Sequence, residues 1–201
     1  MANAMNLPEP FEMPIEYRRV SFGKRLAAVL IDSATAFVTG LLLGLFLIGV
    51  GLFELSMIDA AAVADLQEVY ADLGLERSVA TEVFLLTSAV GIGTTITSAL
   101  LSLLELFIGA SVGKLTLGLQ IGHVDGRRGD VQLWTRRWIV KNLGTLVATV
   151  SLIPALSFLS IMGTLIGIVL FVGCFLALGN ERLALHDRIA QTAVFRKEDV
   201  Q

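Results

Sequence analysis

The sequence contains few of the residues from which catalytic and metal sites are usually built. It has one cysteine and two histidines among 201 residues, so we expect no intrachain disulfide, no cysteine-based metal site and no histidine-rich catalytic centre. A phosphate-binding glycine loop and a kinase-type motif are also missing from it. We therefore expect a protein that is not an enzyme and that holds no cofactor and no metal.

Charged residues are also scarce, and long apolar runs take their place. They make up 16% of the chain, against 55% hydrophobic residues, whereas an average soluble domain has about 25% charged residues. The mean hydropathy is +0.77. No basic patch interleaved with aromatic residues is present, so we expect no nucleic-acid binding. This composition indicates a protein of the lipid bilayer.

The apolar runs predict an all-α membrane protein with four transmembrane helices. The run at 143–178 has 36 residues, which as one helix would extend about 54 Å, too long for a hydrocarbon core of roughly 30 Å. We therefore divide it near Pro154. The predicted spans are 26–53, 81–108, 138–154 and 157–178.

The distribution of basic residues favours four spans through the positive-inside rule. With four spans, both termini and the central loop share one side of the membrane. That side then holds 14 of the 15 basic residues, and only Arg77 lies opposite. We expect both termini in the cytoplasm and the membrane to be the inner membrane of a bacterial cell.

The segments outside the spans have their own patterns. Residues 1–21 form a polar, proline-containing tail, which is not a signal peptide because it is acidic where a signal peptide is basic. Residues 54–78 are acidic and apolar at helical spacing, which predicts an external amphipathic helix. DGRRG between LTLGLQIGHV and DVQLW predicts a short cytoplasmic β-hairpin. NERLALHDRIAQTAVF predicts a C-terminal amphipathic helix with Asn180 as N-cap. We place a transmembrane domain at 22–196 and a terminal tail at 197–201.

One carboxylate lies inside the first predicted span. Asp32 follows Arg25 by seven residues, which puts about 10 Å of helix axis between them, too far for a close pair in a straight helix. Hydrocarbon tolerates an ionised carboxylate poorly. Two interpretations remain open. Asp32 accepts hydrogen bonds or a salt bridge from a neighbouring helix and fixes packing, or it binds an ion or a proton.

The second predicted span carries a stripe of small and polar side chains at helical spacing. Small residues let helices pack closely, and their hydroxyls can hydrogen-bond across the contact. Hydroxyls and a carboxylate would also supply the oxygens of an ion or proton path. Packing and an ion path both remain open. The stripe consists of Ser88, Gly91, Thr95, Ser98, Ser102, Glu105 and Gly109.

Three segments, in this order and spacing, resemble one known family. They are RLAAVLID, GASVGKLTLGLQIGHVDGRRGDVQLWTRRWIVKN and LHDRIAQTAV. Over about residues 18–196 the sequence resembles the RDD family of integral membrane proteins. That family is named for one arginine and two aspartates, which match Arg25, Asp32 and Asp187 here. Some members are associated with sodium/proton antiport, so the resemblance implies a transport function.

Two functions are therefore expected. The first is a transporter-like protein, a monovalent cation (sodium or lithium)/proton antiporter or a subunit of one, with Asp32 and Glu105 binding the ion or proton. The second is a non-transporting scaffold or partner-binding module in which the charged residues form a structural clasp. Four spans make a thin wall around a pathway, so we expect a homodimer or larger homo-oligomer. The expected charged network consists of Arg25, Lys114, Arg137 and Asp187.

Overall fold

Three long apolar segments dominate the computed structural model, which describes residues 14–54, 60–74 and 76–200. In this part of the chain, three segments are long and apolar enough to cross a membrane. They are α2 (Phe22–Gly49), α4 (Arg77–Ile108), and α8 (Leu159–Gly173) with its 3-10 continuation η3 (Cys174–Leu178). Each has at least 20 residues, the length that a bilayer core requires. These segments agree with three of the four predicted spans.

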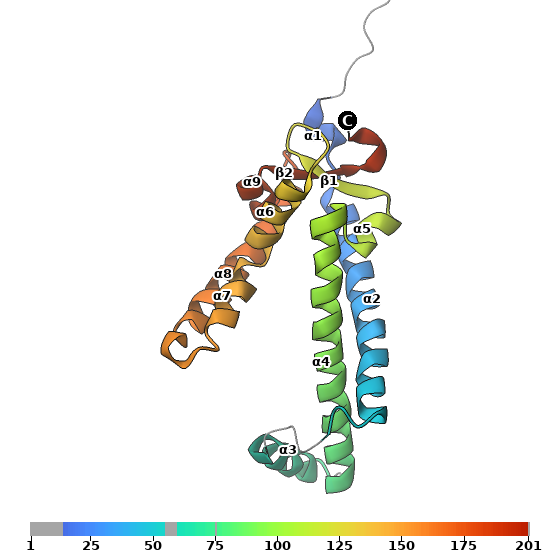
Figure 1. The fold of residues 1–201 in the computed structure, drawn as a ribbon, viewed down its shortest axis with the longest axis vertical. Coiled ribbons are helices and arrows are strands. Elements are labelled where there is room, and N and C mark those ends of the chain that lie inside the picture. The colour runs from blue at the N-terminus through green and yellow to red at the C-terminus, as the bar shows by residue number, and fades with distance from the viewer. Residues whose placement is uncertain (1–13, 55–59, 75, 201) are drawn as a thin grey trace, which may run out of the picture. The chain divides into compact units, whose positions relative to one another are not determined.

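The segment predicted as the third span, 138–154, has a different local structure. It contains the end of α6 (Val131–Lys141) and α7 (Leu143–Val150), which meet at Asn142, and it reaches the 3-10 turn η2 (Pro154–Leu156). α7 packs closely against α8, because a Cβ at Gly144 would lie 2.7 Å from the carbonyl oxygen of Gly163. Figure 1 shows the two helices side by side. The fourth crossing and the side of the membrane that holds the termini stay predictions.

The chain forms two compact units, which are described separately. Of the described residues, the first unit comprises 14–27, 105–110 and 114–200, and the second comprises 28–54, 60–74, 76–104 and 111–113. In the second unit, α2 and α4 are in backbone contact, since a Cβ at Gly40 would lie 2.4 Å from Thr94 and one at Gly93 would lie 2.3 Å from the carbonyl oxygen of Gly40. Such close approach is typical of membrane helices with small residues at the contact.

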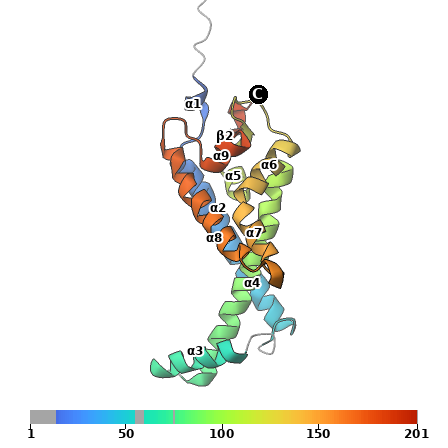
Figure 2. The same ribbon diagram turned by 90° about the vertical axis from the view of Figure 1, so that its left-hand side faces the viewer.

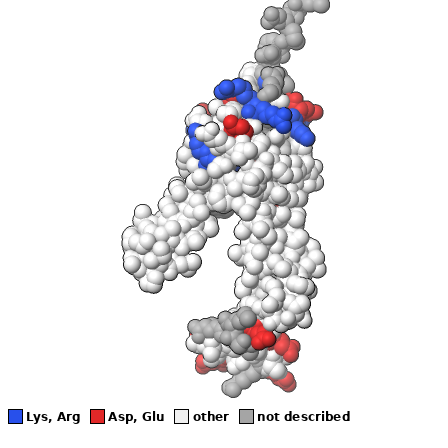
Figure 3. Space-filling view, in the orientation of Figure 1, with Lys and Arg blue, Asp and Glu red and all other residues white. Residues whose placement is uncertain are grey.

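The acidic segment of the second unit forms a helix, as the apolar spacing predicted. This helix is α3 (Ala60–Asp72), and residues 55–59 before it lie outside the described part of the chain. Figure 3 shows acidic side chains gathered at the end of the second unit that holds α3, whereas the visible surface along the middle of α2 and α4 is uncharged. The contrast fits a pair of membrane helices joined by a segment in water.

Among the described residues, the first unit contains one small antiparallel sheet. The predicted β-hairpin is wrong in its second strand, although Arg128 does form an isolated antiparallel bridge with Gly122. β1 (Leu119–His123) pairs with β2 (Thr192–Arg196) near the C-terminus, with Ile121 opposite Val194. The DVQLW segment instead begins α6, because the Asp130 carboxylate caps that helix by accepting the N–H of Leu133 at 2.8 Å. A helix start replaces the expected second strand.

The C-terminal segment is partly helical and partly extended. α9 (Leu185–Ala190) is only six residues long and is preceded by Ala184, so the prediction of Asn180 as N-cap is wrong. β2 follows, and its Phe195 is fully buried against Leu183. Figure 2 shows α6, α9 and β2 close together in this unit. The short helices α1 (Ile15–Arg18), α5 (Val112–Thr116) and the 3-10 turn η4 (Lys197–Asp199) complete the element order.

Candidate functional site: a buried charge cluster and a capping aspartate

Glu105, near the end of α4, accepts hydrogen bonds from three cationic side chains. Its Oε1 accepts from the Lys114 ammonium at 2.7 Å and from the Arg137 guanidinium. Its Oε2 accepts from the Lys141 ammonium at 2.6 Å. The Glu105 side chain is 1% exposed and that of Arg137 is 4% exposed, whereas the Lys141 side chain is 38% exposed. Lys141 is therefore the member of this group that reaches the surface.

Asp187, at the start of α9, is fully buried and joins two arginines. Its Oδ1 accepts from Nε of Arg137 at 2.9 Å, and its Oδ2 accepts from Arg25. Arg25 also donates to the carbonyl oxygen of Arg182 at 2.8 Å. Arg137 contacts both Glu105 and Asp187, so it links the two carboxylates. We call Arg25, Glu105, Lys114, Arg137, Lys141 and Asp187 the charge cluster.

The charge cluster holds four cations against two carboxylates, and this balance shifts its pKa values. Burial, partly offset by the Glu105 carboxylate, lowers the pKa of Lys114 to about 8. Burial alone would raise the pKa of Asp187, but the charges of Arg137 and Arg25 outweigh it and hold that pKa well below its usual range. Both carboxylates thus serve as counter-ions that offset part of the desolvation free energy of the buried cations.

His186 adjoins the charge cluster as a neutral ring. Burial, together with the charge of Arg137, lowers its pKa to about 4. Its Nε2 lies 3.1 Å from a terminal nitrogen of Arg137. Since a guanidinium can only donate, Nε2 is the acceptor and the ring proton belongs on Nδ1. His186 thus fixes Arg137 without adding charge.

Asp32 caps the short helix α5. In the second unit, its Oδ1 accepts the backbone N–H of Gly113, the second residue of α5, at 2.7 Å. Gly113 packs directly on α2, because a Cβ there would lie 2.0 Å from the carbonyl oxygen of Ala28. Ser111 precedes α5 at the usual N-cap position, yet its buried hydroxyl has no hydrogen-bond partner in the described residues. Asp32 therefore performs the capping role that Ser111 would ordinarily have.

The structure brings most of the predicted charged residues together. Arg25, Lys114, Arg137 and Asp187 belong to one cluster, and Glu105, expected as an ion ligand, is its second carboxylate. Asp32 instead bonds to a backbone N–H. Sequence reasoning missed three members or neighbours of the cluster. They are Lys141, His186 and Thr192, whose hydroxyl donates to Asp187 at 3.4 Å.

The three missed residues differ in the signal that the sequence carried for them. Lys141 follows Arg137 by four residues, which places both on one face of α6. His186 is next to Asp187, but adjacent helical residues point in different directions, so the pair alone indicated little. Thr192 lies in β2, beyond the end of α9, and its signal was limited to its place in the segment LHDRIAQTAV that carried the family resemblance.

The polar stripe of α4 lies beside the contact with α2 rather than in it. The closest approaches to α2 involve Ala89, Gly93 and Thr94. Thr95 is exposed, and its hydroxyl donates to the carbonyl oxygen of Gly91 in its own helix at 2.9 Å. The stripe residues Ser88 and Ser102 are partly buried, whereas Ser98 is exposed. Neither an ion path nor a packing role for the stripe follows from these contacts.

Long apolar helices together with the buried charge cluster indicate an integral membrane protein. The model of the RDD family matches residues 19–191, a range that includes Arg25, Asp32 and Asp187. The chain therefore belongs to the RDD family. Comparison with curated proteins and with solved structures gives no match.

Proposed function

We propose that this protein is transporter-like and exchanges a monovalent cation, sodium or lithium, for a proton at Asp32. The observation that carries the proposal is the hydrogen bonding of this carboxylate within an apolar span. Oδ1 accepts the Gly113 N–H at 2.7 Å, and no other described residue hydrogen-bonds to Asp32. An intramembrane carboxylate with one oxygen that no described residue contacts by a hydrogen bond is a candidate site for an ion or a proton.

The chemistry of exchange at one carboxylate is simple. Protonation of Asp32 would remove the charge that holds a cation, and cation binding would disfavour the proton. The nearby chain supplies another oxygen of the kind hard cations prefer, because the buried Ser111 hydroxyl, two residues before Gly113, has no partner in the described residues. A bound ion would relieve the cost of leaving that hydroxyl unpaired.

Glu105 is less suited to hold a transported cation than the sequence suggested. Lys114, Arg137 and Lys141 already donate to its two oxygens. A further cation would be repelled by all three positive charges at short range. In this proposal Glu105 therefore belongs to the clasp, and Asp32 carries the exchange.

The proposal includes the predicted topology and assembly. A fourth crossing by residues 138–154 and cytoplasmic termini would place 14 of the 15 basic residues on the cytoplasmic side. A homodimer or larger homo-oligomer would complete the wall around a pathway that four spans enclose only thinly.

A second candidate function is a non-transporting membrane scaffold. The charge cluster supports it, because every one of the four carboxylate oxygens of Glu105 and Asp187 accepts at least one hydrogen bond. A closed network of this kind fixes structure without leaving a group free for exchange. Under this function Asp32 would serve only as the cap of α5.

Proton flux in liposomes separates the two functions. The purified chain is reconstituted with a pH-sensitive dye inside the vesicles, and sodium or lithium is added outside. We expect cation-driven proton movement that falls to the level of empty liposomes in Asp32→Asn. Asp65→Asn is the matched control, since Asp65 is exposed on α3, and it should keep the wild-type rate.

Two results would reject exchange at Asp32. One is a wild-type rate equal to that of empty liposomes, which would favour the scaffold. The other is unchanged flux in Asp32→Asn. A cooperative thermal unfolding transition, measured for each variant, serves as the control that the variant is folded. Asp32→Glu, which keeps the carboxylate, should retain part of the flux if charge rather than the cap geometry matters.

A further inference from the structure

A cavity of about 680 Å³ in the first unit lies where two apolar segments end. Phe22 begins α2 and Leu178 ends η3, and both line the cavity. The volume is within the range of about 300–1,000 Å³ that is usual for ligand sites. Since both segments are long enough to span a bilayer, their ends belong at the depth of the lipid headgroups.

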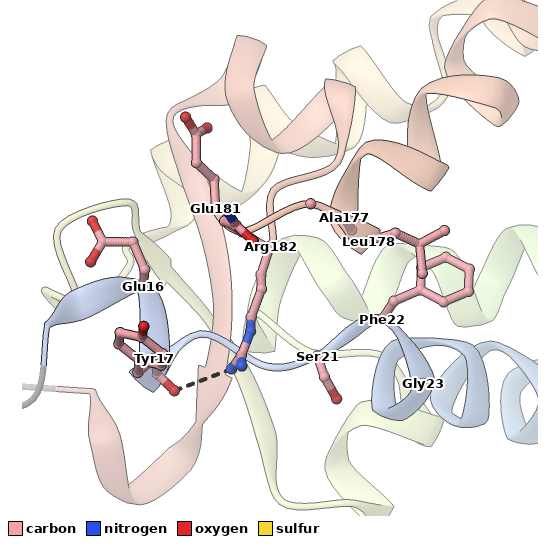
Figure 4. Close-up of a pocket in the computed structure, with 11 residues that line it drawn as sticks. Glu16, Tyr17, Ser21, Phe22, Gly23, Ala177, Leu178, Glu181 and Arg182 are labelled. Carbon is pink, nitrogen blue, oxygen red and sulfur yellow. Dashed lines mark hydrogen bonds between the residues drawn. The ribbon is translucent and has the colours of Figure 1, made fainter.

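The lining of this cavity has an apolar side and a polar side. Figure 4 shows Phe22 and Leu178 together on one side, and Glu16, Tyr17 and Glu181 on the other. Such a division matches an amphipathic ligand, with a hydrocarbon part against the apolar side chains and a polar part against the rest. The apolar wall is fixed by the Phe22 ring, which stacks on Phe175 with 5.8 Å between ring centroids.

Arg182 is held in position between the two sides. Its guanidinium donates to the carbonyl oxygen of Arg19 at 2.8 Å and to that of Tyr17 at 3.3 Å, the bond drawn in Figure 4. It also lies 6.0 Å from the centre of the Tyr17 ring. The backbone φ of Arg182 is +52°, a left-handed conformation that is uncommon for a residue other than glycine. A positive charge is thus presented to the cavity at a constrained position.

The carboxylates at the polar side differ in what they already bind. Glu181 pairs with Arg188 at 3.1 Å. Glu16 is partly buried, and no described residue forms an ion pair with it. Since Glu181 is already paired, the lining offers a ligand one carboxylate, that of Glu16, and one guanidinium, that of Arg182. It favours a ligand that carries an ammonium group as well as an anionic group.

We propose that this cavity binds the headgroup of an aminophospholipid, a phosphodiester that carries a primary ammonium. The ammonium pairs with Glu16. The phosphate lies at Arg182 and at the first turn of α2, where Ser21 and Gly23 line the cavity and free N–H groups favour an anion. The glycerol and the first methylene groups contact Phe22 and Leu178. The bound lipid would tie together the two span ends.

Lipid binding to the purified full chain in detergent tests the proposal. The probes are short-chain phosphatidylethanolamine, short-chain phosphatidylglycerol and free phosphoethanolamine, with binding followed by native mass spectrometry and calorimetry. We expect phosphatidylethanolamine to bind more tightly than phosphatidylglycerol. Glu16→Gln should weaken phosphatidylethanolamine binding about two- to fivefold, as expected for loss of a partly screened ion pair. Glu198→Gln, at an exposed carboxylate outside the cavity, should leave it unchanged.

A second variant tests the apolar side. Leu178→Ala, at a side chain that is largely exposed, should weaken binding of the lipid but not of free phosphoethanolamine. Equal affinity for the two lipids, or an unchanged affinity in Glu16→Gln, would overturn the assignment of the ammonium site. Free phosphoethanolamine binding as tightly as the lipid would show a soluble ligand in place of a lipid, and would also overturn the proposal.

Discussion

Replacing Asp187 by asparagine should strongly destabilise the first unit. The change keeps the size of the side chain but removes the charge that Arg25 and Arg137 both contact. Asp187 is fully buried, so two guanidinium groups would face a neutral amide. Removing one partner of a buried ion pair costs about 3–5 kcal/mol. For a chain of this length that corresponds to a fall in Tm of about 6–20 °C.

Thermal unfolding in detergent measures this effect. Trp134 and Trp138 lie on α6 together with Arg137, so tryptophan fluorescence reports on the part of the unit that the cluster holds. Asp125→Asn is the matched control, because Asp125 pairs with Arg127 at the surface, where such a pair contributes at most about 1 kcal/mol. A fall in Tm for Asp187→Asn no larger than that of Asp125→Asn would refute the role of the cluster as a clasp.

The pH dependence gives an independent test of the same contact. The pKa of Asp187 is lower in the folded protein than in the unfolded chain, where it is about 3.9. Its contribution to stability is therefore complete above about pH 4 and is lost as the pH falls further. The difference in stability between the wild type and Asp187→Asn should shrink when unfolding is measured below about pH 4. A difference that stays constant would assign the effect to packing alone.

Two further predictions concern neighbouring residues of α5. Gly113→Ala should cost about 1–3 kcal/mol, because its Cβ would lie 2.0 Å from the Ala28 carbonyl oxygen, whereas Gly91→Ala, with nothing within 4 Å, should be neutral in the same unfolding assay. Lys114 has a pKa of about 8 in the folded protein, below its unfolded value, so the unfolded chain binds more protons above pH 8. The wild type should therefore gain stability relative to Lys114→Met between pH 8 and 10, and a constant difference would contradict the lowered pKa.

The sequence was most informative where an apolar pattern extended without interruption over several helical turns. The spans at 26–53 and 81–108 correspond to α2 and α4 because an apolar run of that length has few other structures available to it. The acidic helix α3 followed from apolar residues at helical spacing. In these cases the pattern extends over several turns, and tertiary contacts do not need to be known.

The predictions failed where the partner lies far along the chain. β1 alternates as a strand should, but its partner β2 begins 69 residues after the end of β1. DVQLW was nearer and followed a turn-like segment, so local reasoning assigned it as the second strand. The Asp130 cap and the helical period of α6 explain why it is not one. Periodicity identifies a strand, whereas pairing depends on contacts that one sequence does not reveal.

The glycine-lysine pair at Gly113 and Lys114 shows how two adjacent residues can have separate anchors. The Gly113 N–H is held by Asp32, and the Lys114 ammonium is held by Glu105. The first contact requires a residue without a side chain, because the backbone of α2 lies against it. The second requires a long cation that reaches a buried carboxylate. The two requirements differ, so no single property of the dipeptide could have predicted both anchors. The close approach of α2 requires glycine at position 113, and the buried carboxylate of Glu105 requires a long cation at position 114.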